Sequence, residues 1–121
     1  MTGPFVSFKM QPTLNVNSTP TLIFGSQVTC LLDSVLLANQ GETSVVASLW
    51  VAREVEQGQE TEFMLARRVP LAPFEHLDVL TQTTLTLEPG DLLYAQSDYS
   101  DNLFNSFVSY RAFNELAKDG R

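Results

Sequence analysis

Leu85–Ser97, with the sequence LTLEPGDLLYAQS, is the stretch that decides the fold. Leucine and threonine alternate up to Leu87, which is the period of a half-buried strand. Glu88-Pro89-Gly90-Asp91 is a predicted tight turn, because proline presets the backbone at the second turn position and glycine supplies the positive φ of the third. From Leu92 the residues alternate again, so the stretch predicts a strand, a turn and a second strand. None of these residues indicates catalysis.

Short segments in which successive residues alternate between two strand faces, bounded by turn residues, recur along the chain. The clearest example is Ser44–Arg53, in which both faces are largely apolar, so one face is expected to meet another subunit or a long loop. In Gln27–Asn39 the apolar residues also fit a helix face, but the turn residues on both sides favour a strand, with a bulge or break at Asp33-Ser34. The other predicted strands are Thr21–Phe24, Thr61–Arg68, Phe74–Leu80 and Leu103–Phe113.

Turn signals recur at intervals of roughly 8–12 residues, which is typical of an antiparallel sandwich or a small barrel. The predicted fold is therefore all-β: a single antiparallel β-sandwich, Ig-like or jelly-roll-like, of about seven to nine short strands. Asn39-Gln40-Gly41-Glu42 is a predicted hairpin turn, and the prolines of Val69–Pro73 are expected to break regular pairing, which suits an edge or a connection. We expect an N-terminal arm or first strand over residues 1–20, the sandwich over residues 21–113 and a polar tail over residues 114–121.

Length, cysteine content and charge limit the function classes. A chain of 121 residues is expected to form one domain. Its only cysteine, Cys30, allows no internal disulfide and is predicted to be a small buried hydrophobe. The formal net charge of −7 argues against nucleic acid and anionic membranes as direct partners, since both usually demand a basic patch. The sequence shows neither the pattern of a signal peptide nor an apolar run long enough to span a membrane as a helix.

Signals for catalysis or metal binding are weak. His76 shares a strand face with Asp78, yet such a pair also needs a nucleophile within reach, so we expect a surface or interface histidine and no enzyme. Asp98 and Asp101 offer oxygen ligands to a cation, but their turn lacks the glutamate of an EF-hand loop, and aspartates often cap turns. A single histidine and a single cysteine argue against a zinc site. No cofactor is expected, and cation binding at Asp98 and Asp101 stays open.

The aromatic side chains divide between core and interface. Most are expected to fill the core, as aromatic residues interleaved in strands usually do. The surplus apolar faces of Ser44–Arg53 and Leu103–Phe113 favour a protein interface. The predicted interface residues are Phe5, Phe8, Trp50, Phe107 and Phe113.

Three features together resemble the small β-sandwich virion proteins of tailed bacteriophages. A strand runs into a turn at Leu36–Asn39, and the alternating strand Val45–Val51 follows at once. The proline-bearing connection Val69–Pro73 leads into another strand. Leu85–Asp91 then precedes an alternating segment and a polar turn before the last strand. The resemblance covers roughly Gly25–Tyr110.

The resemblance implies a non-enzymatic structural protein of the virion that docks on the capsid surface as a decoration or cement protein. The implied partners are other virion proteins, either the major capsid protein or tail and neck proteins, and a homo-oligomer assembled in the host cytoplasm is expected. The alternative within this class is a neck, tail or baseplate component that attaches fibres. The alternative of another class is a carbohydrate- or ligand-binding β-sandwich, which predicts a solvent-exposed Trp50 or Tyr99 beside Asp98 and Asp101.

Overall fold

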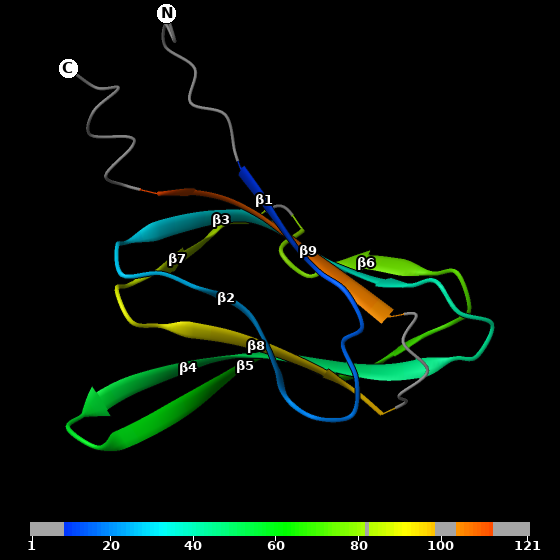
Figure 1. The fold of residues 1–121 in the computed structure, drawn as a ribbon, viewed down its shortest axis with the longest axis horizontal. Coiled ribbons are helices and arrows are strands. Elements are labelled where there is room, and N and C mark those ends of the chain that lie inside the picture. The colour runs from blue at the N-terminus through cyan, green and yellow to red at the C-terminus, as the bar shows by residue number, and fades with distance from the viewer. Residues whose placement is uncertain (1–8, 82, 99–103, 113–121) are drawn as a thin grey trace, which may run out of the picture.

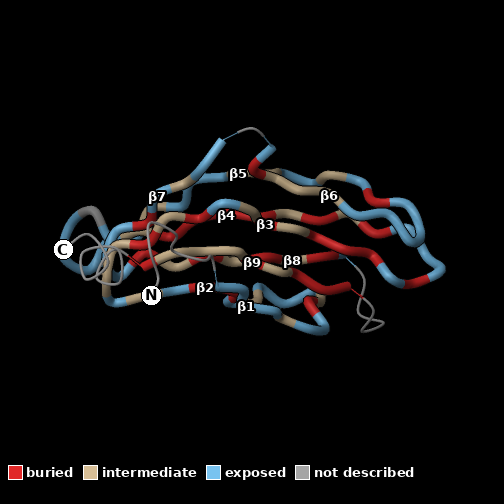
Figure 2. The backbone as a smooth tube through the Cα atoms, turned by 90° about the horizontal axis from the view of Figure 1, so that it is seen from above, coloured by how far each residue is buried: buried red, intermediate tan, exposed pale blue. Residues whose placement is uncertain are grey.

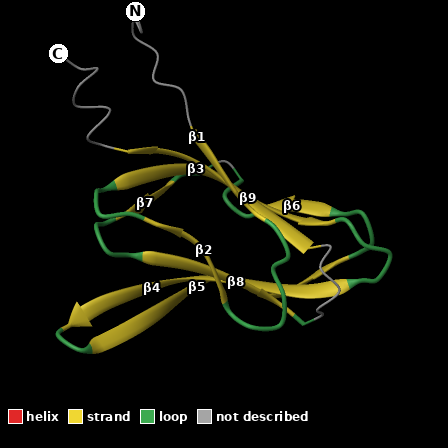
Figure 3. Ribbon diagram, viewed as in Figure 1, coloured by secondary structure: helices red, strands yellow, loops and turns green. Residues whose placement is uncertain are grey.

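The computed structural model describes residues 9–81, 83–98 and 104–112. Figure 3 shows strands and loops, and no helix, in this part of the chain. The strands are β1 (Lys9–Thr13), β2 (Thr21–Gly25), β3 (Cys30–Asn39), β4 (Val45–Glu56), β5 (Gln59–Leu71), β6 (His76–Asp78), β7 (Leu85–Leu87), β8 (Leu92–Ser97) and β9 (Phe104–Ala112). The prediction of an all-β fold is therefore confirmed.

The strands form two antiparallel sheets that face each other (Figure 1). One sheet has the order β1-β9-β3-β6, with β7 also paired to β3, and the other has the order β2-β8-β4-β5. Strand β7 pairs with the first residues of β3, and β6 pairs with its last residues. This arrangement is a β-sandwich, as the spacing of the turn signals predicts.

The apolar side chains that face each other between the sheets form the core, and Figure 2 shows the buried residues along the strands of both layers. Alternate residues of β4 from Val45 to Val51 are buried, which is the pattern predicted for Ser44–Arg53. Cys30 is fully buried, as expected of a small core residue. The register of β3 shifts between Leu32 and Ser34, so the predicted bulge at Asp33 is present.

The predicted hairpin at Asn39–Glu42 is wrong, because β3 and β4 belong to different sheets. The connection crosses from one sheet to the other and is held by the buried side chain of Asn39. Its amide group donates to the carbonyl oxygens of Thr43, Leu71 and Ala72 at 2.9, 3.2 and 3.1 Å, and its Oδ1 accepts the Gly41 N–H at 3.0 Å. A buried amide with its bonds satisfied fixes a chain crossing that the turn residues alone do not reveal.

The turn of Glu88–Asp91 is present as predicted, with Gly90 at a φ of 89°. It too connects the sheets, since β7 pairs with β3 and β8 pairs with β2 and β4. The connection at Asn39 and the turn at Gly90 therefore both cross between the sheets, near opposite ends of β3.

The expectation that Val69–Pro73 breaks regular pairing is wrong for its first part, because β5 continues to Leu71. Strand β5 lies at a sheet edge, where a missing N–H is tolerated. Pro70 lies opposite Val46, whose backbone instead exchanges bonds with Asp98: the Val46 N–H donates to the Asp98 carboxylate, and the Asp98 N–H donates to the Val46 carbonyl. Both backbone groups of Val46 are thus directed toward the β8 side, so the ladder lacks no bond from residue 70, and the edge position accommodates the proline.

Candidate functional site

Of the predicted interface residues, Trp50 and Phe107 lie in the described part of the chain. Phe5, Phe8 and Phe113 lie outside the described residues. Trp50 and Phe107 lie on different sheets, and each points away from the core, because the next residues along their strands, Val51 and Val108, are core members. The two predicted residues therefore belong to separate outer faces.

An apolar row crosses the outer face of the β2-β8-β4-β5 sheet. Leu22, Tyr94, Trp50 and Met64 are successive register partners on the four strands. The indole of Trp50 stacks on the ring of Tyr94, with centroids 5.8 Å apart and an interplanar angle of 18°. We call these four residues the outer row.

In the outer row Trp50 is buried, Tyr94 is half-buried and the two end residues are exposed. Trp50 is only 7% exposed, although it lies outside the core cluster, whereas Leu22 and Met64 are 51% and 43% exposed. Because burial of apolar surface is favourable, exposed apolar residues that continue a stacked aromatic pair form a surface that a partner can cover with a gain in stability. The sequence does not predict that Leu22 and Met64 are exposed, because strand alternation alone does not show which of the two faces points to the core.

A hollow of about 490 Å³ lies beside Trp50 and Met64. Its other lining residues are Pro20, Ser48, Glu62, Arg67, Arg68 and Gln96. Arg67 and Arg68 lie in a β-bulge opposite Ser48; Arg68 has a φ of 52°, and its N–H donates to the Ser48 hydroxyl at 3.0 Å. The bulge thus places the adjacent arginines of an acidic chain next to the outer row.

The outer face of the other sheet carries a weaker apolar strip. Phe107 is half-buried and lies between Pro12 of β1 and Leu36 of β3. Its neighbours along the row are therefore apolar, but the large exposed hydrophobic side chain on this sheet is Met10, at 61% exposure.

Among the described residues, Phe74 has the most exposed large hydrophobic side chain, at 69%. It follows Pro73 in a turn closed by the Glu75 N–H, which donates to the Ala72 carbonyl at 3.1 Å. Its φ of 63° lies in the left-handed region, which a type II turn demands at this position and which favours glycine or asparagine. A phenylalanine there costs about 1–2 kcal/mol in backbone strain. The strand predicted from Phe74 is wrong at this residue, because the turn includes Phe74 and β6 begins only at His76. In the sequence, Pro73 is the one residue that indicates the turn.

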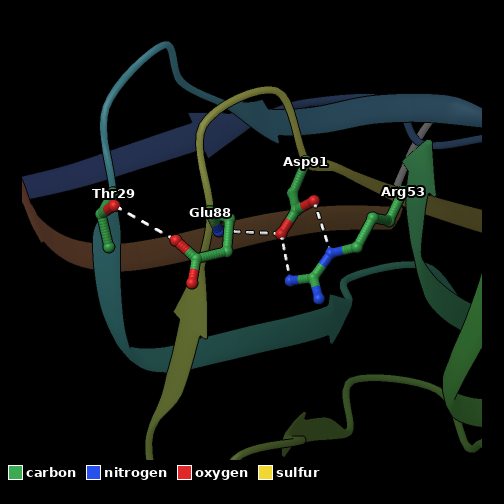
Figure 4. Close-up of polar contacts among 4 residues, drawn as sticks. All are labelled: Thr29, Arg53, Glu88 and Asp91. Atoms are coloured by element: carbon green, nitrogen blue, oxygen red, sulfur yellow. Dashed lines mark hydrogen bonds and ion pairs between the residues drawn. The ribbon is translucent and has the colours of Figure 1, made fainter. Parts of the chain in front are cut away.

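An ion pair ties the Glu88–Asp91 turn to β4 (Figure 4). Arg53 donates from Nε to Asp91 Oδ1 at 2.8 Å and from Nη2 to Asp91 Oδ2 at 2.6 Å, and the Glu88 N–H donates to the same carboxylate at 2.8 Å. The hydrogen bonds from Arg53 lower the pKa of Asp91, and the Glu88 N–H adds to this lowering, although burial opposes it. The same bonds raise the pKa of Arg53. This pair fixes the turn to β4 and continues the pairing of β4 with β8 by one residue, since Ala52 and Leu92 are register partners.

Of the carboxylates predicted as candidate ligands or orienting groups, Asp78 and Asp98 accept hydrogen bonds from the backbone. Asp78 Oδ1 accepts the N–H groups of Val35 and Leu80 at 3.3 and 3.1 Å, while His76 on the same strand is exposed. Asp98 caps Val46, and Asp101 and Tyr99 lie outside the described residues. Within the described ranges, no group of three or more His, Cys, Asp or Glu side chains is placed to hold a metal ion.

In the described residues, no helix has the length and hydrophobicity needed to cross a membrane. No family model matches the sequence, and comparison with curated proteins and with solved structures gives no significant match. The candidate function therefore rests on the surface described above and on the resemblance seen in the sequence.

Proposed function

We propose that the protein is a non-enzymatic structural protein of a bacteriophage virion and docks on the capsid surface as a decoration protein. The observation that carries the proposal is the outer row, an apolar line across a sheet face that points away from the core. The sandwich fold is compatible with the resemblance to small virion proteins, which supplies the virion as the setting.

The outer row has the composition of a protein contact surface. Its centre is a stacked Trp–Tyr pair, and its ends are the exposed side chains of Leu22 and Met64. Aromatic residues and methionine are enriched at the centres of interfaces, where desolvation is complete. Arg67 and Arg68 at the margin favour a partner surface that presents carboxylates there.

The proposal includes the absence of a catalytic role. It is supported by the hydrogen bonds that the carboxylates of Asp78 and Asp91 make within the fold. The Asp78 carboxylate accepts two backbone N–H groups, and a carboxylate held in this way is poorly placed to orient His76. Asp91 is committed to Arg53 and to the Glu88 N–H. We therefore assign these carboxylates to stability.

A ligand-binding module is the second candidate, and the hollow beside Trp50 favours it. A sugar ring needs an open aromatic face on which to stack, and Trp50 exposes only 7% of its surface. The protein contact is accordingly the better-supported role for this face. A glycan array on which the protein binds a defined sugar, with loss of binding in Trp50→Phe, would reverse this order.

Incorporation into particles tests the proposal. Tagged copies are expressed in the host during particle assembly, and purified particles are probed for the tag. The unaltered chain is expected in the particles, and the double variant Leu22→Gln, Met64→Gln is expected to be depleted at least about tenfold. Met10→Gln, at an even more exposed apolar residue on the other sheet, is the control and should be incorporated normally. Equal incorporation of all three chains would contradict docking through the outer row.

A further inference from the structure

The turn at Phe74 presents its ring from a rigid support. Besides the bond that closes the turn, the Ala72 N–H donates to the Glu75 carboxylate at 2.7 Å, and the Asn39 N–H donates to the Glu75 carbonyl at 2.9 Å. The Asn39 side chain donates to the carbonyls of Leu71 and Ala72. These bonds hold a strained φ of 63° at a residue whose side chain is 69% exposed. Strain that the surroundings maintain at a surface aromatic residue points to a function for that residue.

A small apolar crevice opens at the opposite end of the sandwich. It lies between the inner sides of β4 and β5 and the strand β7, and its volume is about 130 Å³. Its lining residues are Val51, Arg53, Phe63, Leu65, Leu85, Thr86 and Leu87. Phe63 is 46% exposed although its register partner, Val51, belongs to the core. We call this site the β7 crevice.

The β7 crevice has the size and chemistry to receive one phenyl ring. A cavity of about 150 Å³ lined by aliphatic and aromatic side chains is known to take up benzene. The β7 crevice is similar in volume and is lined mainly by Val, Leu and Phe side chains. Phe74 is the side chain on this chain's described surface that offers such a ring at the greatest exposure.

The ring and the crevice of one chain cannot meet. Phe74 lies just before β6, which pairs with Leu36–Ala38 at the end of β3, whereas β7 pairs with Cys30–Leu32 at its start. Six residues of strand separate the centres of these two pairings, which is about 20 Å at 3.3 Å per residue. Figure 1 shows β6 and β7 toward opposite ends of the sandwich. A second copy of the chain, by contrast, can bring its own Phe74 ring to the crevice.

We propose that the protein self-associates head to tail, with Phe74 of one copy inserted into the β7 crevice of the next. Because the two surfaces differ, the contact is heterologous and continues from copy to copy until a ring closes or a filament grows. The contact leaves the outer row free, so the inference goes beyond the capsid-docking proposal and does not rest on it.

Analytical ultracentrifugation of the purified chain tests the contact. Two variants are compared with the unaltered chain, one without the ring and one with an altered crevice. Phe74→Asn removes the ring and suits the left-handed backbone, so the fold is retained, and Phe63→Gln makes the crevice polar at a half-exposed site. The unaltered chain should form assemblies larger than dimers as concentration rises, and each variant should associate at least about tenfold more weakly. Met10→Gln, at an exposed apolar residue of β1 that belongs to neither the β7 crevice nor the outer row, is the control and should assemble like the unaltered chain.

Mixing the two variants gives the decisive result. The Phe63→Gln chain still carries the ring and the Phe74→Asn chain still carries the crevice, so one contact forms and a heterodimer is expected. A monomeric unaltered chain, variants that assemble normally, or a mixture that stays monomeric would each overturn the proposal. Any of these results leaves capsid docking to be judged by particle incorporation, so the two proposals fail separately.

Discussion

Trp50 and Tyr94 lie directly opposite each other on β4 and β8, with their rings stacked 5.8 Å apart on the side of the sheet that faces away from the core. Trp50 is therefore buried by its neighbours on the sheet surface, and not by the opposite sheet. Core and interface are usually treated as alternative places for a tryptophan. Trp50 combines features of both, because it is buried in the free chain and also lies on the proposed docking face. Its contribution to stability and its contribution to docking can be measured separately.

We expect Trp50→Ala to lower the free energy of unfolding by about 3 kcal/mol, because a large buried side chain is removed and the site collapses only in part. The stacked pair itself should contribute about 1 kcal/mol as the coupling energy of a double-mutant cycle with Tyr94→Ala. Urea unfolding of the four chains measures both quantities. A coupling energy near zero would show that the rings do not support each other.

The ion pair of Arg53 and Asp91 should make stability depend on pH in the acid range. The folded pKa of Asp91 is lowered below its usual value of 3.8, chiefly by the hydrogen bonds from Arg53, so the unfolded chain binds this proton more tightly. The resulting stability is fully present above about pH 4 and is lost as the pH falls toward the lower folded pKa. Asp91→Asn should lower stability by about 2 kcal/mol at neutral pH.

Thermal unfolding of the unaltered chain and of Asp91→Asn between about pH 2 and pH 7 measures this dependence. The difference in stability between the two chains should shrink as the pH falls below about 4. Asp33→Asn, at an exposed bulge residue of β3, is a control that changes charge without removing this pair. A difference that stays constant down to the acid limit would show that Asp91 carries no pairing energy.

Relief of backbone strain should make Phe74→Asn more stable than the unaltered chain by about 0.5–1 kcal/mol. Little apolar contact is lost, because the side chain is 69% exposed. Phe74→Ala removes the ring without suiting the positive φ, so it should not show this gain. Denaturant unfolding at a concentration where each chain is monomeric provides the comparison, and a loss of stability in Phe74→Asn would mean that the turn is not strained.

The hydroxyl of Ser106 is fully buried and finds no hydrogen-bond partner in the described structure. Ser106→Ala should therefore leave stability unchanged or raise it by up to about 1 kcal/mol, because an unpaired polar group is removed from the core. Ser97→Ala is the matched control: its buried hydroxyl donates to the Val16 carbonyl, so the same substitution should cost about 1 kcal/mol. Calorimetry of both variants makes the comparison, which fails if Ser106→Ala is the more damaging change.

Alternation and turn chemistry predict much of the fold. Both signals are local, and they succeed for the buried residues of β4, the turn at Gly90 and the bulge at Asp33. They do not reveal which sheet a strand joins. The crossing at Asn39 depends on bonds from its side chain to Leu71 and Ala72, more than 30 residues away, so the sequence reads as a hairpin there.

The candidate surfaces are less predictable for a related reason. Trp50 and Phe107 can be picked out because both faces of their strands are apolar. Leu22 and Met64 become part of the outer row only through the registers of β2 with β8 and of β4 with β5. Bulges set those registers, and the bulges in β5 at residues 65 and 67–68 leave no clear mark in the sequence. The register cannot be read without the partner strand.

Imaging of particles from the source with a gold-labelled antibody against the chain tests the central claim most directly. Docking as a decoration protein predicts gold over the capsid, at positions that follow its symmetry. Gold at the neck, tail or baseplate would contradict capsid docking and move the same surface to the attachment of fibres. Particles without gold, under conditions in which the antibody detects the purified chain, would contradict the virion assignment and leave ligand binding at the hollow beside Trp50 as the leading account.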